Sequence, residues 1–244
     1  MLNVSKNPVL LAAFLVLAQQ STVEITAEPS HHQVLQNDWV RVFNVLAAPK
    51  ATTLVHRHNY DYVFVTLGDT QIINSRVGEN PVSMALKDGE VRFTKGGFAH
   101  AVTNTGDTPF HNITIELLRP STGVHACTAG CTVLLPCDAS EKTACPSSQI
   151  LFQSDQWTLA STVFPTGAIH AEHVHLNPHL VVAVSNLDLK LQVKGNAPAE
   201  LHRAIGDVGW VDPVVHSLTN ASSAPARIVT IEFNPTATPD HNHL

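Results

Sequence analysis

Short runs of apolar residues recur along the chain, and each is bounded by glycine, aspartate, asparagine or proline. Examples are YVFVTL from Tyr62, HNITIELL from His111, LVVAVS from Leu180 and ARIVTIEF from Ala226. Runs of about five residues at this close spacing are typical of β-strands in a sandwich or barrel. No long helical periodicity follows the N-terminal apolar segment. The pattern therefore predicts an all-β protein.

The two halves of the chain repeat one another. The segment 36–49, QNDWVRVFNVLAAP, resembles 153–165, QSDQWTLASTVFP. The segment HAVTNTGDTPFHNITIELL from His100 has its counterpart in HSLTNASSAPARIVTIEF from His216. These landmarks are separated by 116 or 117 residues. An offset this constant indicates a tandem duplication.

The duplication divides the chain into a leader, two β-domains and a connection. A chain of 244 residues is long enough for two domains of about 100 residues each. We expect a signal peptide at 1–18, an N-terminal barrel at 30–120, a cysteine-containing linker at 121–149, a C-terminal barrel at 150–236 and a polar tail at 237–244.

The N-terminal segment has the pattern of an export signal. Lys6 precedes an apolar run from Val9 to Ala18, which is short for a membrane span. Small residues at its end, Val16 and Ala18, are typical of a cleavage site. A signal anchor or a buried N-terminal helix is the alternative. We expect an exported protein, periplasmic or secreted, with no membrane association after cleavage.

Four cysteines fall within one short window: Cys127, Cys131, Cys137 and Cys145. In an exported protein an even, clustered set most simply forms two disulfides, and the sequence leaves their pairing open. A zinc knot is the alternative. The spacing C-x3-C-x5-C-x7-C lacks the C-x2-C pairs usual for structural zinc, so it favours disulfides.

Charged residues are sparse and scattered. They make up 14% of the chain, and the net charge is -6. No basic cluster is present that would bind a nucleic acid. We therefore expect a small-molecule ligand or substrate as the partner and no nucleic acid, while monomer and homo-oligomer both remain open.

Histidines follow a distinct pattern in the first half. His56 and His58 are one residue apart, so on a strand both side chains face the same way. Asp61 follows, and His100 comes directly after the segment TKGGF, whose glycine pair suits a tight turn. Three imidazoles and a carboxylate are a ligand set for a divalent transition metal: Mn, Fe, Zn, Ni or Cu. We predict that these four residues form a metal site, with Asp61 either a ligand or an acceptor that orients a histidine.

The second half repeats this pattern with four imidazoles. His173 and His175 share a strand face, His179 takes the place of the aspartate, and His216 corresponds to the later histidine. Without a carboxylate, a bound ion keeps its full formal charge, which favours an anionic ligand such as a carboxylate or enolate. We predict a second metal site at these four residues.

Other polar and aromatic residues receive structural interpretations. Asn104 and Asn220 are expected to close turns, and the three tryptophans to lie in the core. The histidines without paired spacing are interpreted as structural or solvated: His31, His32, His111, His125, His170 and His202.

These motifs resemble those of the cupin superfamily, and the duplication resembles its two-domain members, the bicupins. The family's first motif is G-x5-H-x-H-x3,4-E-x6-G, and its second is G-x5-P-x-G-x2-H-x3-N. Gly68, Gly89, Gly97, His100 and Asn104 fit the first half, and Gly167, His173, His175, His216 and Asn220 fit the second. Asp61 and His179 stand at the glutamate position, Lys50 and Asn186 at glycine positions, and Lys95 at the proline.

The resemblance covers nearly everything from 36 to 235 and implies a fold. Each half would be a double-stranded β-helix, a jelly-roll-like barrel with a metal at one mouth. The pocket beside the metal would be lined by alternate strand positions: Val63 and Val65 in the first half, and Val181 and Ala183 in the second.

The resemblance also implies a function. Bicupins similar to this chain cleave carbon–carbon bonds in oxalate-like acids or oxidise enol substrates, so we expect a metal-binding oxidoreductase, a dioxygenase or a decarboxylase. No second carboxylate faces either H-x-H pair, because strand alternation turns Glu172 away from the metal. A non-catalytic module that binds a metal and a small ligand is therefore the alternative. Sugar-phosphate isomerisation fits poorly, since no Arg or Lys cluster would hold a phosphate.

Overall fold

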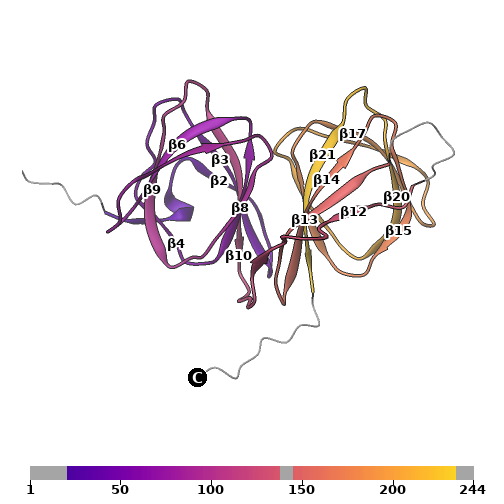
Figure 1. Ribbon diagram of the computed structural model, residues 1–244, viewed down its shortest axis with the longest axis horizontal. Coiled ribbons are helices and arrows are strands. Elements are labelled where there is room, and N and C mark those ends of the chain that lie inside the picture. Colours follow the sequence, from indigo (N-terminus) through magenta and orange to yellow (C-terminus); the bar gives the residue numbers. More distant parts are fainter. Residues whose placement is uncertain (1–20, 138–144, 235–244) are drawn as a thin grey trace, which may run out of the picture.

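The computed structural model describes residues 21–137 and 145–234. The expected signal peptide at 1–18 and the polar tail at 237–244 lie outside the described residues. Within these described ranges all regular structure is β apart from one short 3-10 helix, η1 (Ile25–Ala27), and the strands form two barrels side by side (Figure 1). The expected all-β, two-barrel fold is confirmed.

The first barrel consists of two five-stranded sheets. One has the order β1-β4-β9-β6-β7 and the other the order β2-β3-β10-β5-β8. Their strands are β1 (Val23–Glu24), β2 (His31–Gln36), β3 (Val40–Ala47), β4 (His56–His58), β5 (Tyr62–Leu67), β6 (Thr70–Arg76), β7 (Val82–Leu86), β8 (Val91–Thr94), β9 (Phe98–Asn104) and β10 (Phe110–Leu117).

The second barrel follows the same plan. A seven-stranded sheet has the order β11-β13-β14-β21-β16-β19, with β12 also paired to β13, and a four-stranded sheet has the order β15-β20-β17-β18. The strands are β11 (His125–Ala126), β12 (Thr132–Leu134), β13 (Ser147–Gln153), β14 (Trp157–Phe164), β15 (Ile169–His175), β16 (His179–Ala183), β17 (Leu187–Val193), β18 (Ala199–Arg203), β19 (Val208–Val211), β20 (Val214–Asn220) and β21 (Ala226–Phe233).

The strand register repeats along with the strand order. In the first barrel Glu116 on β10 lies opposite Tyr62 on β5, and in the second Glu232 on β21 lies opposite His179 on β16. His179 is therefore equivalent to Tyr62. The repeat alignment had instead placed it at the position of Asp61, one residue earlier.

One turn shows why the family motif begins with a glycine. Gly167 has a φ of 73°, in the left-handed region where glycine carries no steric cost. Lys50, which stands at the equivalent position of the first repeat, has a φ of 61°. Its ammonium donates to the Thr105 carbonyl at 2.6 Å, so a side-chain contact accompanies the strained backbone.

The predicted turn asparagines are confirmed. The Asn104 amide donates to the carbonyls of Ala47, Ala48 and Thr108, and its oxygen accepts from the Gly106 N–H. Asn220 makes the equivalent contacts in the second barrel. Each side chain thus joins two loops at one end of its barrel.

The largest apolar core lies between the barrels. It joins the sheet that contains β10 to the sheet that contains β21, and Trp39, Trp157 and Trp210 belong to it or pack against it. Val63 and Val65 are fully buried in this core. The expectation that they line the first pocket was wrong, because the strand presents the alternate residues, Tyr62 and Phe64, to the cavity.

The segment that contributes β11 and β12 to the second barrel carries two disulfides. They join Cys127 to Cys131 and Cys137 to Cys145, so the expectation of two disulfides is confirmed and the pairing is sequential. The carbonyl of Pro136 accepts from the Ala171 N–H at 2.9 Å, which places this segment along the edge of β15. Among the residues described, no helix has the length and apolar character to cross a bilayer.

Replacing Ile115 with alanine tests the shared core. Ile115 is fully buried on β10 between the barrels, so the truncation leaves a cavity and is expected to cost about 2–5 kcal/mol of unfolding free energy. Denaturant titration measures this loss. Val34→Ala, at a residue 51% exposed on β2, is the control and should change stability by no more than about 0.5 kcal/mol. Equal losses in both variants would contradict the assignment.

Candidate metal centres

Three histidines of the first barrel converge through strand pairing. His56 and His58 lie on β4, and the antiparallel register with β9 places His100 directly opposite His56. All three side chains are buried, with His56 1% and His58 2% exposed. Cross-strand partners have their Cβ atoms about 5 Å apart, so the register brings the imidazoles into contact.

A backbone carbonyl and a side-chain amide each hold one of these rings through its Nδ1 atom. His56 Nδ1 donates to the Leu54 carbonyl at 2.9 Å, and His100 Nδ1 donates to Asn74 Oδ1 at 2.7 Å. In these two rings the lone pair is therefore on Nε2. The Nε2 atoms of His58 and His100 are 3.1 Å apart, and His56 Nε2 is buried with no hydrogen-bond partner.

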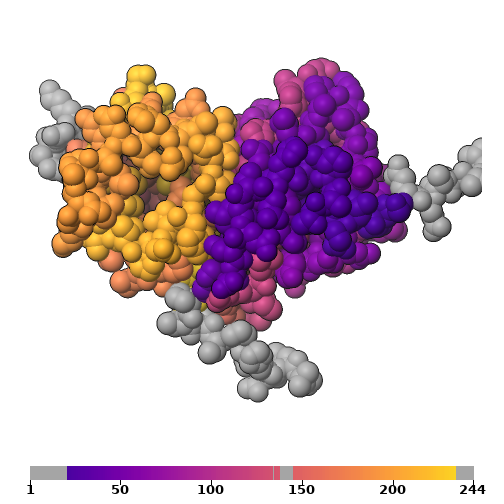
Figure 2. Space-filling model, turned by 180° about the vertical axis from the view of Figure 1, so that it is seen from behind, coloured from indigo at the N-terminus to yellow at the C-terminus, as the bar shows by residue number. Residues whose placement is uncertain are grey.

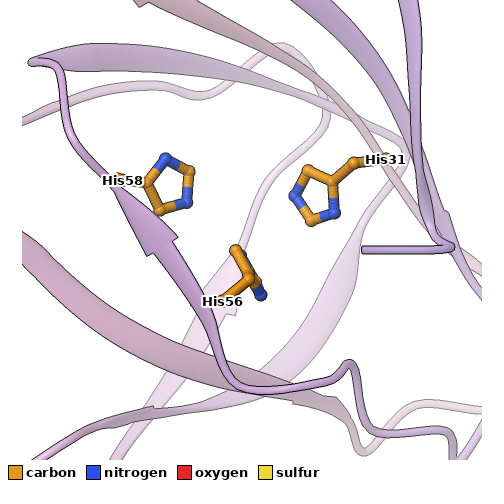
Figure 3. A group of neighbouring side chains, drawn as sticks. All are labelled: His31, His56 and His58. Carbon is orange, nitrogen blue, oxygen red and sulfur yellow. The ribbon is translucent and has the colours of Figure 1, made fainter. Parts of the chain in front are cut away.

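His31 joins this cluster from the other sheet. Its ring lies 4.6 Å from that of His56, and one ligand atom each from His31, His56 and His58 lie within 4.8 Å of one another (Figure 3). Glu28 accepts from its Nδ1 at 2.6 Å. Sequence reasoning missed this residue, because β2 is remote from β4 in the chain and only barrel closure brings them together.

Asp61 lies in the turn before β5. Its Oδ1 accepts from the Gly96 N–H at 2.9 Å, so its described contact is with the TKGGF loop. It does not line the cavity that the histidines face. A role for Asp61 as a ligand, or as an acceptor that orients a histidine, stays a prediction.

The second barrel brings together the equivalent three histidines. His173 on β15 lies opposite His216 on β20, and their Nε2 atoms are 3.0 Å apart. His173 Nε2 is also 3.2 Å from His175 Nε2. Because His173 Nδ1 donates to the Ala171 carbonyl at 2.9 Å, its Nε2 lone pair points at the other two rings.

Two further histidines surround this second cluster. His179 stacks on His175 at 4.2 Å between ring centroids, as Tyr62 stacks on His58 at 4.1 Å in the first barrel. His170 stacks on His173 at 3.6 Å. The sequence predicted His179 as a metal ligand, whereas His170 was interpreted as structural or solvated. The β15 register shifts between His170 and His173, and this irregularity turns both rings to the same side.

A carboxylate stands beside each H-x-H pair, on the last strand of each barrel. Glu116 is fully buried and accepts from Arg41 Nε at 2.8 Å and Nη2 at 2.5 Å, while its Oε1 is 3.8 Å from His58 Nδ1. Glu232 accepts from His175 Nδ1 at 3.4 Å and from Asn177 Nδ2 at 3.2 Å. Sequence reasoning found no such carboxylate, although the repeat alignment already contains both glutamates.

Burial lowers the pKa of several clustered histidines and so favours their neutral form. In the first barrel it lowers the pKa of His56 to about 4 and of His100 to about 3. In the second it lowers the pKa of His179 to about 4 and of His216 to about 3. Neutral imidazoles near pH 7 leave their lone pairs free for a metal.

The donor atoms fit a divalent transition metal. Metal–imidazole bonds are about 2.0–2.1 Å long, so two nitrogens at right angles on one ion are about 3 Å apart. The ring nitrogens here are 3.0, 3.1 and 3.2 Å apart. The buried His56 Nε2 has no hydrogen-bond partner, and a bound cation would satisfy it.

Each cluster faces a cavity, and the two cavities differ. The first has a volume of about 240 Å³ and is lined in part by polar side chains, among them Asn74, Arg76 and Arg92. The second has a volume of about 420 Å³ and is lined mainly by apolar side chains, including Val181 and Ala183 as expected from the sequence. Figure 2 shows the two lobes from behind, with a hollow in the C-terminal one.

No family model matches the sequence, and no curated protein matches it. Solved structures match the fold. A cupin 2 conserved barrel protein from Leptotrichia buccalis is 11% identical, with 84% of this chain and 88% of that chain covered and a TM-score of 0.51. A variant of oxalate decarboxylase from Bacillus subtilis is 11% identical, with coverages of 84% and 75% and a TM-score of 0.55.

A third match is salicylate 1,2-dioxygenase from Pseudoaminobacter salicylatoxidans, at 12% identity, coverages of 80% and 68%, and a TM-score of 0.53. At these identities the likeness shows the fold alone. The chain thus has the fold of these cupin structures, with two such barrels in tandem.

The neutral histidines predict acid sensitivity of the metal-free protein. An unfolded histidine has a pKa of about 6.5, whereas those of His56 and His216 are lowered to about 4 and about 3. Between these values the unfolded state binds more protons, so stability is present above about pH 6.5 and is lost as the pH falls. Urea midpoints measured with a chelator should therefore be lower at pH 5 than at pH 7.5.

The double variant His100→Asn with His216→Asn is the comparison, since it lacks two of these groups and should lose less stability over the same range. Midpoints that do not change with pH in the wild-type protein would show that the histidines are not buried in the neutral form.

Proposed function

We propose that this bicupin is an exported, metal-dependent oxidoreductase that acts on a small organic acid or enol, as a dioxygenase or a decarboxylase of the oxalate decarboxylase kind. The observation that carries the proposal is the convergence of imidazole nitrogens inside each barrel. The nitrogens are 3.0–3.2 Å apart and lie beside a cavity.

The proposed ligands are the repeated histidines of each barrel. His56, His58 and His100, with His31 beside them, would hold the first ion, and His173, His175, His216 and His179 the second. When bound, a divalent ion of this kind polarises a carboxylate or enol and supports redox chemistry with dioxygen. The repeated histidines alone leave open positions for a substrate oxygen.

The chain's own groups support a division of labour between the barrels. The second cavity, at about 420 Å³, is large enough for a small organic molecule and is lined by leucine, valine and phenylalanine side chains. Glu232 and Arg203 also line it, which provides a carboxylate and a guanidinium where a substrate acid would lie. We therefore place the chemistry in the second barrel.

A non-catalytic role is the second candidate, and the first barrel favours it. The side chains of His56, His58 and His100 are all buried. The neighbouring carboxylate, Glu116, is paired with the Arg41 guanidinium. A centre of this kind is suited to holding an ion permanently. On this alternative, both ions stabilise the barrels and the cavities store a ligand.

Export is part of the proposal. The two disulfides of the connection support an oxidising compartment, periplasmic or extracellular. The proposed partners are the metal and a small molecule, without a nucleic acid, since the charge is sparse and the net value is -6.

Metal titration tests the two-centre assignment. The chelated wild-type protein is expected to bind two equivalents of Mn²⁺ or Zn²⁺, and His58→Ala and His175→Ala one each, measured by calorimetry. The remaining sites should differ in affinity, because the two centres differ in burial and in their fourth histidine. Indistinguishable curves for the two variants would count against two chemically different centres.

Turnover tests the enzymatic assignment. Protein loaded with Mn²⁺ or Fe²⁺ should consume oxygen, or deplete the substrate, with one of oxalate, gentisate, a β-diketone or a flavonol. His216→Ala should lose at least about 100-fold in rate if the second barrel carries the chemistry, and His100→Ala should retain most of it. Tight metal binding without turnover on any of these classes would favour the non-catalytic role.

A further inference from the structure

The two glutamates beside the H-x-H pairs occupy equivalent places with different neighbours. Glu116 lies opposite Arg41 on β3, and Glu232 lies opposite Thr158 on β14. The repeat therefore provides an internal comparison, in which one carboxylate faces a guanidinium and the other faces a short hydroxyl side chain.

In the first barrel the guanidinium determines what the carboxylate can do. Arg41 donates two hydrogen bonds to Glu116 Oε2, and the side chain of Glu116 is fully buried. The other oxygen, Oε1, has no hydrogen-bond partner and is 3.8 Å from His58 Nδ1, which has none either. A separation of 3.8 Å is beyond hydrogen-bond range. Glu116 is thus paired with Arg41, and the Nδ1 atom of His58 has no hydrogen-bond acceptor.

In the second barrel the carboxylate is directed at the histidines. Glu232 Oε2 accepts from His175 Nδ1 at 3.4 Å, and Oε1 accepts from Asn177 Nδ2 at 3.2 Å. Glu232 also lines the second cavity, whereas Glu116 does not line the first. A carboxylate that accepts from Nδ1 places the ring proton there and leaves the lone pair on Nε2. The Nε2 atom of His175 is the one that faces His173.

We propose that Glu232 is the positioning residue of the second centre: it fixes the Nδ1–H tautomer of His175 and so directs the Nε2 lone pair at the metal, while Arg41 withholds Glu116 from this role in the first barrel. The inference rests on the proposed function, since it assigns an ion to the second cluster. The two centres would then differ in one feature: only the second has a carboxylate that accepts a hydrogen bond from a proposed ligand histidine.

The test measures Co²⁺ affinity and the visible absorption of bound Co²⁺ in a His58→Ala background, where only the second centre remains. Glu232→Gln removes the charged acceptor and is expected to weaken Co²⁺ binding by about 10–100-fold and to alter the absorption band. The unfolding midpoint of the metal-free variant should stay close to that of its parent, because the side chain is 37% exposed.

The matched control is Glu172→Gln. Glu172 is adjacent to His173 in sequence but is exposed and paired with Lys194 at 3.4 Å, so its replacement should leave both the affinity and the absorption band unchanged. Unchanged Co²⁺ binding in Glu232→Gln, or equal weakening in both variants, would overturn the inference.

Thr158→Arg is the second variant. It places a guanidinium opposite Glu232, as Arg41 stands opposite Glu116, and is expected to draw the carboxylate away and weaken Co²⁺ binding as well. If Glu232→Gln lowers the unfolding midpoint of the metal-free protein, the test rests on Thr158→Arg. Unchanged Co²⁺ affinity in Thr158→Arg would then overturn the inference. Failure of the His58→Ala parent to bind Co²⁺ would instead overturn the proposed function, and the positioning role with it.

Discussion

Two cross-strand histidine pairs position the histidine clusters of this protein. His56 lies opposite His100, and His173 lies opposite His216, each in an antiparallel ladder. A shift of either register by one residue would turn every side chain of the strand to the opposite face. The H-x-H spacing then adds one more ring to the same face. The ladders, more than the loops, therefore define both centres.

The barrels that hold these ladders are stabilised by one another. The largest core lies between them, and it includes Val65 from the first barrel and Leu159 from the second. An ion pair between Asp88 and Arg227 also joins the two lobes. Because each barrel turns one sheet toward its partner, the cavities are confined to the remaining space inside each barrel, next to the histidines.

Much of the fold and site could be predicted from the sequence, since they depend on local alternation and on the repeat. Alternation alone places His173 and His175 on one face, and the constant offset identifies His216 as their partner. His31 could not be predicted in this way, because its approach depends on closure of the two sheets. The assignment of Val63 to the pocket failed for another physical reason: both faces of β5 are apolar, so the sequence does not distinguish cavity from core.

The two glutamates show a different limit. Glu116 and Glu232 each lie within a mainly apolar strand. The sequence of such a strand does not predict which group the glutamate side chain contacts. Their roles depend on the residue opposite, Arg41 in one barrel and Thr158 in the other. Duplication has thus produced two clusters that share three equivalent histidines and differ in their surroundings.

The measurement that tests the central claim most directly is a crystal structure of the Mn²⁺- or Zn²⁺-loaded protein with anomalous scattering at the metal edge. The account predicts one anomalous peak in each barrel, within about 2.3 Å of the Nε2 atoms of the repeated histidines. Peaks confined to surface sites, with the buried imidazoles hydrogen-bonded only to water or to one another, would contradict it.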